Sequence, residues 1–120
     1  MGAVTTVNLA DVEPIELPHG SWSRMLVTKA QVGSNASSLG YSVFTPGTVL
    51  APVSHETEEV AFVVSGRGQL RLDDGLVEFA EGDALHIPAN TWHAVANTGD
   101  ADVVMVFGFP HPDYPPTERR

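Results

Sequence analysis

The sequence contains no cysteine. This absence excludes disulfides, thiolate metal ligands and cysteine nucleophiles, so a metal ion could be held only by imidazole, carboxylate or water. Basic residues are also few, since six Lys and Arg stand against 15 Asp and Glu and the formal net charge is −9. A chain of this charge would repel phosphate backbones and anionic lipids, so we expect neither nucleic acid nor a membrane as a partner.

Long apolar runs and helical periodicity are missing as well. No stretch approaches the length of a membrane span, and the first eleven residues lack the basic and apolar regions of a signal peptide. We therefore expect a soluble protein of the cytoplasm. With 120 residues, of which 42% are hydrophobic and 18% charged, the chain is expected to fold as one domain over residues 1–120.

What the sequence does contain is a series of short β-runs separated by turn residues, of which Asp73-Asp74-Gly75 is the clearest hairpin turn. The runs recur at the spacing of roughly 8–12 residues that is typical of an all-β sandwich or barrel. We predict strands over residues 21–28, 39–45, 59–64, 69–72, 76–79, 84–87, 93–97 and 102–109. The core is expected over 21–109, and the Pro-rich segment 110–120 is predicted to be an extended tail on the body or on a partner subunit.

Three possible metal ligands stand near predicted strand ends. His55 and Glu59 lie four residues apart at the entry of one strand, and His93 begins a later one. Alternation along a strand allows His55 and Glu59 to share an inner face, with His93 reaching them from the opposing sheet. Two imidazoles and one carboxylate suit Fe(II), Mn(II), Zn(II) or Ni(II). Each residue alone is also typical of a surface or hydrogen-bonded position.

Two groups of residues resemble the two motifs of the cupin family. The first group has the family spacing at Gly47, Val53, His55, Glu59 and Gly66. The second has it at Gly82, Pro88, Asn90, His93 and Asn97. The resemblance covers about residues 40 to 110 and is closest to small single-domain cupins of the conserved-barrel type.

The resemblance implies a double-stranded β-helix, or jelly roll, with one divalent metal ion in the narrow interior of the barrel. His55, Glu59 and His93 match the family's ligands; Fe2+ is the first choice of metal, with Mn2+, Zn2+, Ni2+ or Cu2+ as alternatives. Val53 departs from the pattern, because the family has its first His there. Asn90 replaces the usual Gly of a turn, a mild change because Asn tolerates a left-handed conformation.

His86 is a candidate general base or fourth ligand if its side chain points into the barrel. Leu85 and Ile87 have the opposite parity and are apolar, so the pattern leaves its direction open, and a hydrogen-bonded core His is the alternative interpretation. The residues predicted to line a substrate pocket, or else simply to pack the core, are Tyr41, Val53, Phe62, Trp92, Met105 and Phe107. Arg24 is a candidate for holding an anionic group, with a solvated side chain as the plainer interpretation.

Several functions remain open at this stage. The first choice is a metal-dependent enzyme acting on a small organic substrate, with a dioxygenase-type reaction favoured because two His and one carboxylate leave coordination sites free. An isomerase, cyclase, decarboxylase or lyase of the same fold is the alternative, and a non-catalytic small-molecule-binding barrel with a decayed metal site is another. Small cupins usually pair, so a homodimer is expected, and the apolar run 103–109 offers a surface for it.

Overall fold

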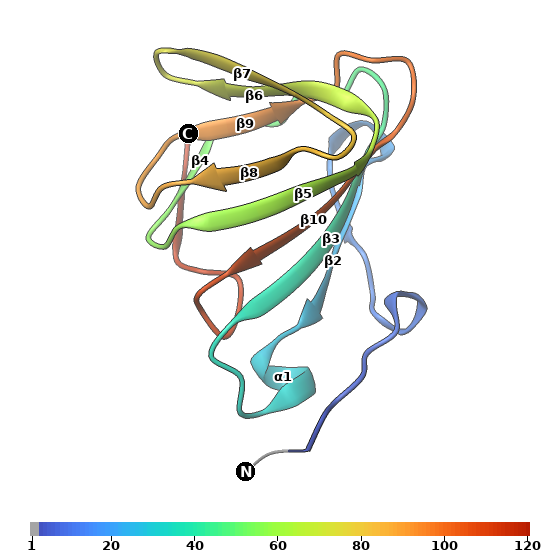
Figure 1. Cartoon of the computed structure of the whole chain (residues 1–120), viewed down its shortest axis with the longest axis vertical. Helices are drawn as coiled ribbons and strands as arrows, with labels where there is room; N and C mark the ends of the chain where they lie inside the picture. The colour runs from blue at the N-terminus through green and yellow to red at the C-terminus, as the bar shows by residue number, and fades with distance from the viewer. Residues whose placement is uncertain (1–2) are drawn as a thin grey trace.

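A computed structural model of the chain describes residues 3–120 and consists almost entirely of β-strands in two antiparallel sheets. The six-stranded sheet has the order β1 (Ile15–Glu16), β2 (Trp22–Val27), β3 (Ser38–Phe44), β10 (Val103–Phe109), β5 (Glu59–Ser65) and β8 (Ala84–Ile87). The five-stranded sheet has the order β11 (Thr117–Arg119), β4 (Val53–His55), β9 (His93–Ala96), β6 (Arg67–Leu72) and β7 (Gly75–Ala80). Figure 1 shows them as the two walls of a barrel, which confirms the predicted jelly roll.

The core lies between the two sheets because apolar side chains alternate along the central strands. In β5, Ala61 and Val63 are buried, while Val60 and Phe62, which alternate with them, are about half exposed. In β10 every second residue from Val103 to Phe109 is buried. One face of each strand therefore packs into the barrel and the other faces outward.

The predicted strands are all present, with boundaries shifted by at most two residues. Sequence analysis missed β1, β4 and β11, which have two or three residues each and are too short to show a period. It also missed three short helices: η1 (Leu9–Asp11), η2 (Pro18–Gly20) and α1 (Lys29–Val32). None of the helices within residues 3–120 is long and apolar enough to cross a membrane.

The Pro-rich segment lies on the body of the protein, which is one of its two predicted placements. It differs from the predicted tail in that its last residues form β11, which extends the five-stranded sheet by pairing antiparallel with β4. Thr117 pairs with His55 and Arg119 with Val53. The segment beyond residue 109 is therefore part of the barrel, and the predicted core of 21–109 is too short at this end.

Two motif residues have structural roles in turns. Gly66, between β5 and β6, has a φ of 87°, and a Cβ there would collide with the carbonyl oxygen of Asp102. Asn90 has a φ of 60°, which confirms the left-handed conformation expected of it. Asn97, at the end of the second motif, donates from Nδ2 to the carbonyl oxygens of Phe44 (2.8 Å) and Ala101 (2.9 Å) and so fixes the packed end of the barrel.

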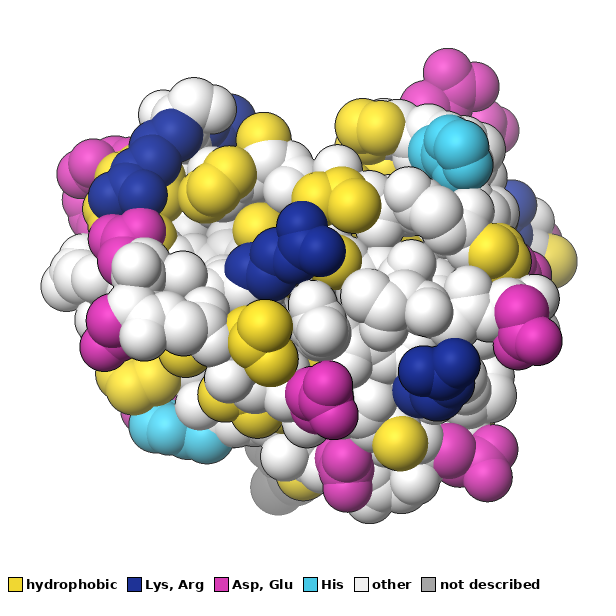
Figure 2. Space-filling view, turned by 90° about the horizontal axis from the view of Figure 1, so that it is seen from above, with side chains coloured by type: hydrophobic (Ala, Val, Ile, Leu, Met, Phe, Trp, Pro, Cys, Tyr) yellow, Lys and Arg dark blue, Asp and Glu magenta, His cyan; other side chains and the backbone are white. Residues whose placement is uncertain are grey.

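The outer surface mixes charge and apolar groups. On the face that lies uppermost in Figure 1, Figure 2 shows Lys or Arg side chains spread among Asp, Glu and hydrophobic ones. The part of this face that the structure describes thus offers no continuous basic surface of the kind that binds phosphate backbones.

Candidate metal centre

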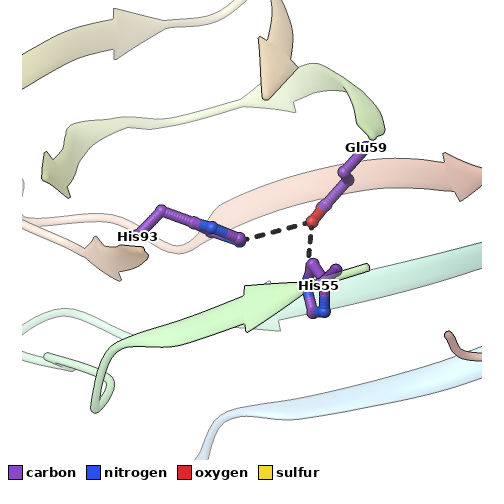
Figure 3. A group of neighbouring side chains, drawn as sticks. All are labelled: His55, Glu59 and His93. Atoms are coloured by element: carbon purple, nitrogen blue, oxygen red, sulfur yellow. Dashed lines mark ion pairs between the residues drawn. The ribbon is translucent and has the colours of Figure 1, made fainter. Parts of the chain in front are cut away.

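Three side chains from both sheets converge inside the barrel, as Figure 3 shows. His55 ends β4 and His93 begins β9, which are neighbours in the five-stranded sheet, while Glu59 begins β5 in the other sheet. Nε2 of His55 lies 3.2 Å and Nε2 of His93 3.4 Å from Oε1 of Glu59. The predicted convergence is present, but the predicted grouping is wrong, because the chain changes sheets between His55 and Glu59.

The three residues are well shielded from solvent. The side chains of His55, His93 and Glu59 are 4%, 7% and 13% exposed. Buried ionisable groups are stable only when they are paired or bind an ion, since burial without a partner is costly. Within residues 3–120 these three residues form the one group of His, Asp and Glu side chains arranged so that a single metal ion could be held.

The hydrogen bonds of His93 indicate which group the cluster can bind. Its Nδ1 lies 2.8 Å from the carbonyl oxygen of Thr91, which can only accept, so Nδ1 carries a hydrogen. The neutral ring then turns the lone pair of Nε2 toward the carboxylate of Glu59, and two acceptors face each other. A cation between them, either a proton on His93 or a metal ion, satisfies both groups.

The pKa shifts agree with this arrangement. Burial alone would raise the pKa of Glu59, but hydrogen bonds and charge from His55 and His93 outweigh burial and hold the pKa below its usual value. Burial alone would lower the pKa of His93, but its bonds to Glu59 and to the Thr91 carbonyl outweigh burial and raise it. Without metal, the cluster therefore attracts a proton.

Aromatic rings surround His55. Its ring packs edge-to-face on Phe109 at 5.0 Å and on Tyr114 at 5.2 Å, measured between ring centroids. Burial and the charge of Glu59 raise the pKa of Tyr114, although Arg119 and Thr117 act in the opposite direction. The phenol is therefore protonated at neutral pH, and it covers His55 from the side of the 110–120 segment.

Val53 is the nearest of the predicted pocket residues. It pairs with His93 across β4 and β9, so its side chain lies on the same face of the sheet as that ligand. An apolar side chain therefore stands where the family has its first His. If the cluster holds a metal ion, the chain would supply three ligands, and further coordination positions would be left for water or substrate.

His86 is not brought to the cluster: its side chain points outward, so the condition for its candidate role as a general base or fourth ligand is not met, and it is not a core His either. It pairs with Val60 across β8 and β5, on the outer face. Its side chain is 59% exposed, and its Nε2 lies 3.4 Å from Oε1 of Glu58, which is also exposed. Leu85 and Ile87 take the inner positions of this strand, so the local alternation turns His86 outward.

Three predicted pocket residues also lie on the outer face. Tyr41 and Phe62 both pair with Val106, one on each side of β10, so these two residues face away from the buried Met105 and Phe107. Arg24, opposite Tyr41, donates from Nη1 to the carbonyl oxygen of Leu9 at 2.9 Å and lies over the Trp22 ring. Its interactions hold the N-terminal segment, and a role for Arg24 in holding an anionic group stays a prediction.

The other predicted pocket residues are divided. Met105 and Phe107 are buried in the core between the sheets. Trp92 stands at a surface hollow whose lining contains none of the three ligands, and the guanidinium of Arg120 lies 4.1 Å from the centre of its ring. Sequence analysis missed Thr117, Phe109 and Tyr114 as neighbours of His55. No motif marks them: Phe109 directly precedes the Pro-rich segment, and Tyr114 and Thr117 lie within it on either side of Pro115-Pro116.

Comparisons with known proteins agree with the fold and show the family. A family model described as "Cupin domain" matches residues 40–109. The chain is 30% identical over 102 residues to polyketide synthase CurC of Streptomyces cyaneus, covering 84% of this chain and 66% of CurC. It is 31% identical over 108 residues to protein SchB of Streptomyces halstedii, covering 86% of this chain and 78% of SchB.

Solved structures share the fold at low identity. The polyketide cyclase RemF from Streptomyces resistomycificus superposes with a TM-score of 0.81 at 21% identity, covering 98% of this chain and 85% of RemF. An oxalate decarboxylase from Lactobacillus farciminis superposes with a TM-score of 0.83 at 20% identity, covering 93% of this chain. This chain spans about a third (34%) of that decarboxylase chain.

Proposed function

The chain belongs to the cupin family, and from that premise we propose that it is an enzyme that binds one divalent metal ion through His55, Glu59 and His93 and acts on a small, carbonyl-rich organic substrate. The observation that carries the proposal is the convergence of two imidazole nitrogens on one buried carboxylate oxygen, at 3.2 and 3.4 Å. These three side chains would hold the ion, which would supply Lewis-acid polarisation of a carbonyl group.

We infer that the reaction is a cyclisation. The names of CurC and RemF refer to polyketides, whose repeated carbonyl groups are good partners for a Lewis acid. In such a reaction a carbon between two carbonyls attacks a third carbonyl of the same molecule, a C–C bond forms and one water leaves. No oxidant or reductant is needed, and holding the chain in a bent conformation supplies much of the rate.

The residues around the ligands suit such a substrate. Val53 beside His93 and the aromatic rings of Phe109 and Tyr114 beside His55 form an apolar surround for a chain of alternating methylenes and carbonyls. Their role is to bind and orient the substrate and to exclude water. The ligand cluster contains no fourth His, Asp or Glu within the described chain, so specificity would rest on shape and packing.

A dioxygenase is the second candidate. The observation in its favour is the ligand set itself, because two His and one carboxylate with open positions are typical of non-haem Fe(II) oxygenases. In this case O2 would be consumed, and both of its atoms would enter the products.

One assay separates the two candidates. The protein is loaded with Fe(II), Mn(II), Ni(II) or Zn(II) in turn and incubated with a linear aromatic-polyketide analogue, with and without O2, and the products are analysed by mass spectrometry. A cyclase releases one water per turnover without O2, whereas a dioxygenase adds O2 and stops when it is withheld. His93→Ala should abolish either activity and His86→Ala should preserve it. If His93→Ala kept the activity of the wild type, the proposal would be contradicted.

We also propose that two copies of the chain pair through the outer face of the six-stranded sheet. Val60, Phe62 and Val64 are 43–50% exposed, and the outward positions of β10 beside this strand are Val104, Val106 and Gly108. A face of this composition is unusual for solvent contact, and a two-fold pair would cover it with the same face of the partner. We expect light scattering to show a dimer for the wild type and a monomer for Phe62→Lys. A wild-type monomer at micromolar concentration would contradict the proposed pairing.

A further inference from the structure

We propose that Thr117 is a positioning residue of the metal centre, whose hydroxyl group fixes the tautomer and the orientation of the His55 ring. The inference rests on the proposed function, because a fixed ring matters most if His55 binds a metal ion. It concerns a residue 62 positions away from its target in the sequence, outside both cupin motifs.

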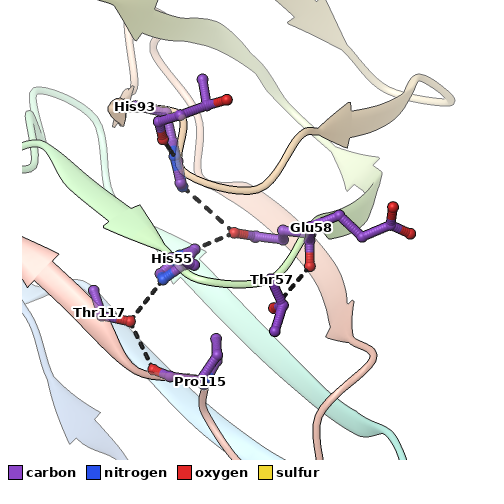
Figure 4. Close-up of polar contacts among 8 residues, drawn as sticks. His55, Thr57, Glu58, His93, Pro115 and Thr117 are labelled. Atoms are coloured by element: carbon purple, nitrogen blue, oxygen red, sulfur yellow. Dashed lines mark hydrogen bonds and ion pairs between the residues drawn. The ribbon is translucent and has the colours of Figure 1, made fainter.

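The argument starts from a short chain of hydrogen bonds, visible in Figure 4. Oγ1 of Thr117 lies 2.8 Å from the carbonyl oxygen of Pro115 and 2.7 Å from Nδ1 of His55. A hydroxyl group has one hydrogen to donate, and a carbonyl oxygen can only accept. Because the hydroxyl donates to Pro115, Oγ1 must accept from His55, and Nδ1 of His55 must carry a hydrogen.

This assignment decides what His55 presents to the cluster. A neutral imidazole with its hydrogen on Nδ1 has its lone pair on Nε2, the atom that faces Glu59 at 3.2 Å. His93 is held in the same tautomer by the carbonyl oxygen of Thr91. Both imidazoles therefore turn a metal-binding lone pair toward the same carboxylate, and each is fixed from behind by an oxygen atom.

The backbone of β11 holds the hydroxyl in place. Thr117 is paired with His55 in the β11–β4 register, and just before it the backbone N–H of Glu56 donates to the carbonyl oxygen of Pro116 at 3.1 Å. Three residues further on, Arg120 makes a bidentate ion pair with Asp73 at 2.6 and 3.0 Å. The segment is thus attached to the barrel on both sides of Thr117.

The test uses variants that differ only at the hydroxyl group. Thr117→Val keeps the shape and removes the hydroxyl, Thr117→Ala removes it with less bulk, and Thr117→Ser retains it. Thr57→Val is the matched control, because Thr57 lies between His55 and Glu59 in sequence and its hydroxyl donates to the Glu58 carbonyl instead of a ligand. Circular dichroism and urea unfolding establish that each variant is folded.

The first readout is the tautomer of His55 in the metal-free protein, measured by two-bond 1H–15N NMR of histidine-labelled chain at a pH where the ring is neutral. We expect the Nδ1–H form in the wild type, Thr117→Ser and Thr57→Val. In Thr117→Val and Thr117→Ala, Nδ1–H loses its acceptor, so the hydrogen should move to Nε2, which can donate to Glu59. An unchanged tautomer in both variants that lack the hydroxyl would overturn the inference.

The second readout is the dissociation constant for Zn(II) and Mn(II), measured by competition with a chromophoric chelator. Loss of the Thr117 hydroxyl should weaken binding by about 10- to 100-fold, with Thr117→Ser and Thr57→Val close to the wild type. Equal affinity in all variants would overturn the positioning role even if the tautomer moves. A wild type that binds no metal would overturn the proposed function instead, and the tautomer measurement would still decide the hydrogen bond.

Discussion

Glu58 and Glu59 are adjacent in the chain, and each lies within 3.4 Å of a histidine, but the two pairings have different surroundings. Glu58 faces His86 on the outside of the barrel, where the side chains are 52% and 59% exposed. Glu59 faces His55 and His93 inside, where no side chain of the three is more than 13% exposed. The distances are nearly the same, so distance does not distinguish them.

Burial and the number of partners distinguish the two sites. Water screens the outer pair, and exposed ion pairs of this kind contribute little to stability. The inner carboxylate has exchanged water for two imidazole rings, one of which turns a lone pair toward it through its bond to Thr91. An arrangement of acceptors without a cation is costly, so the inner site is suited to bind an ion and the outer one is not.

The largest expected difference between the two sites is in metal affinity. Glu59→Gln keeps the size of the side chain but replaces a carboxylate with an amide, a much poorer metal ligand. We expect its affinity for Zn(II) or Mn(II) to fall by more than the roughly 10- to 100-fold that loss of an outer-shell partner costs. Glu58→Gln should bind like the wild type. Titration against a chromophoric chelator measures both, and equal losses in the two variants would show that the comparison is wrong.

A smaller effect is expected in the pH dependence of stability without metal. Because the pKa of His93 is raised, the contribution of His93 to the free energy of unfolding is fully present at pH values below the ordinary pKa of 6.5. It is lost as the pH rises through the raised pKa. The lowered pKa of Glu59 means that its contribution is present above 4.5 and is lost as the pH falls through the lowered pKa. Stability from the cluster should therefore be greatest between these two values.

Urea unfolding in the presence of EDTA, at pH values from about 4 to about 9, measures this profile. We expect the free energy of unfolding to decline above neutral pH, while metal affinity increases over the same range because metal and proton compete for His93. Glu59→Gln should flatten the stability profile and Glu58→Gln should leave it intact. If the stability profile of the wild type matched that of Glu59→Gln, the cluster would not be the source of the pH dependence of stability.

The smallest effect is expected at the outer pair. His86→Ala removes an exposed ring whose polar contact within residues 3–120 is the 3.4 Å one to Glu58, so the free energy of unfolding should change by no more than about 0.5 kcal/mol. Metal affinity should not change. Denaturant unfolding of the variant at pH 7 measures the first and chelator competition the second. A clear loss of metal affinity in this folded variant would show that His86 takes part in metal binding after all.

The sequence predicted the three residues of the inner site because the resemblance to the two motifs marks His55, Glu59 and His93. Alternation did not predict their grouping, because it placed His55 with Glu59, whereas the fold places His55 beside His93 in one sheet. The same rule could have placed His86, because Leu85 and Ile87 are two apolar residues of one parity in a strand of four residues. A single polar residue between two apolar ones is more often the outward one.

Thr117 and Tyr114 could not be found in this way. They contact His55 because β11 pairs with β4, and each of these strands has only three residues, which is too few for a period. Two prolines next to them favoured an extended tail. The long-range pairing that brings the segment to the site is a property of the folded barrel, which no local pattern contains.

The most direct measurement is the metal content of the purified protein by plasma mass spectrometry, after exposure to Fe(II), Mn(II), Ni(II) and Zn(II) in turn and removal of unbound ions. The wild type, His55→Ala and His86→Ala are compared as metal-to-chain ratios. The account predicts a ratio near one for the wild type and for His86→Ala, and none for folded His55→Ala. No bound metal in the wild type, or equal metal in all three, would contradict it.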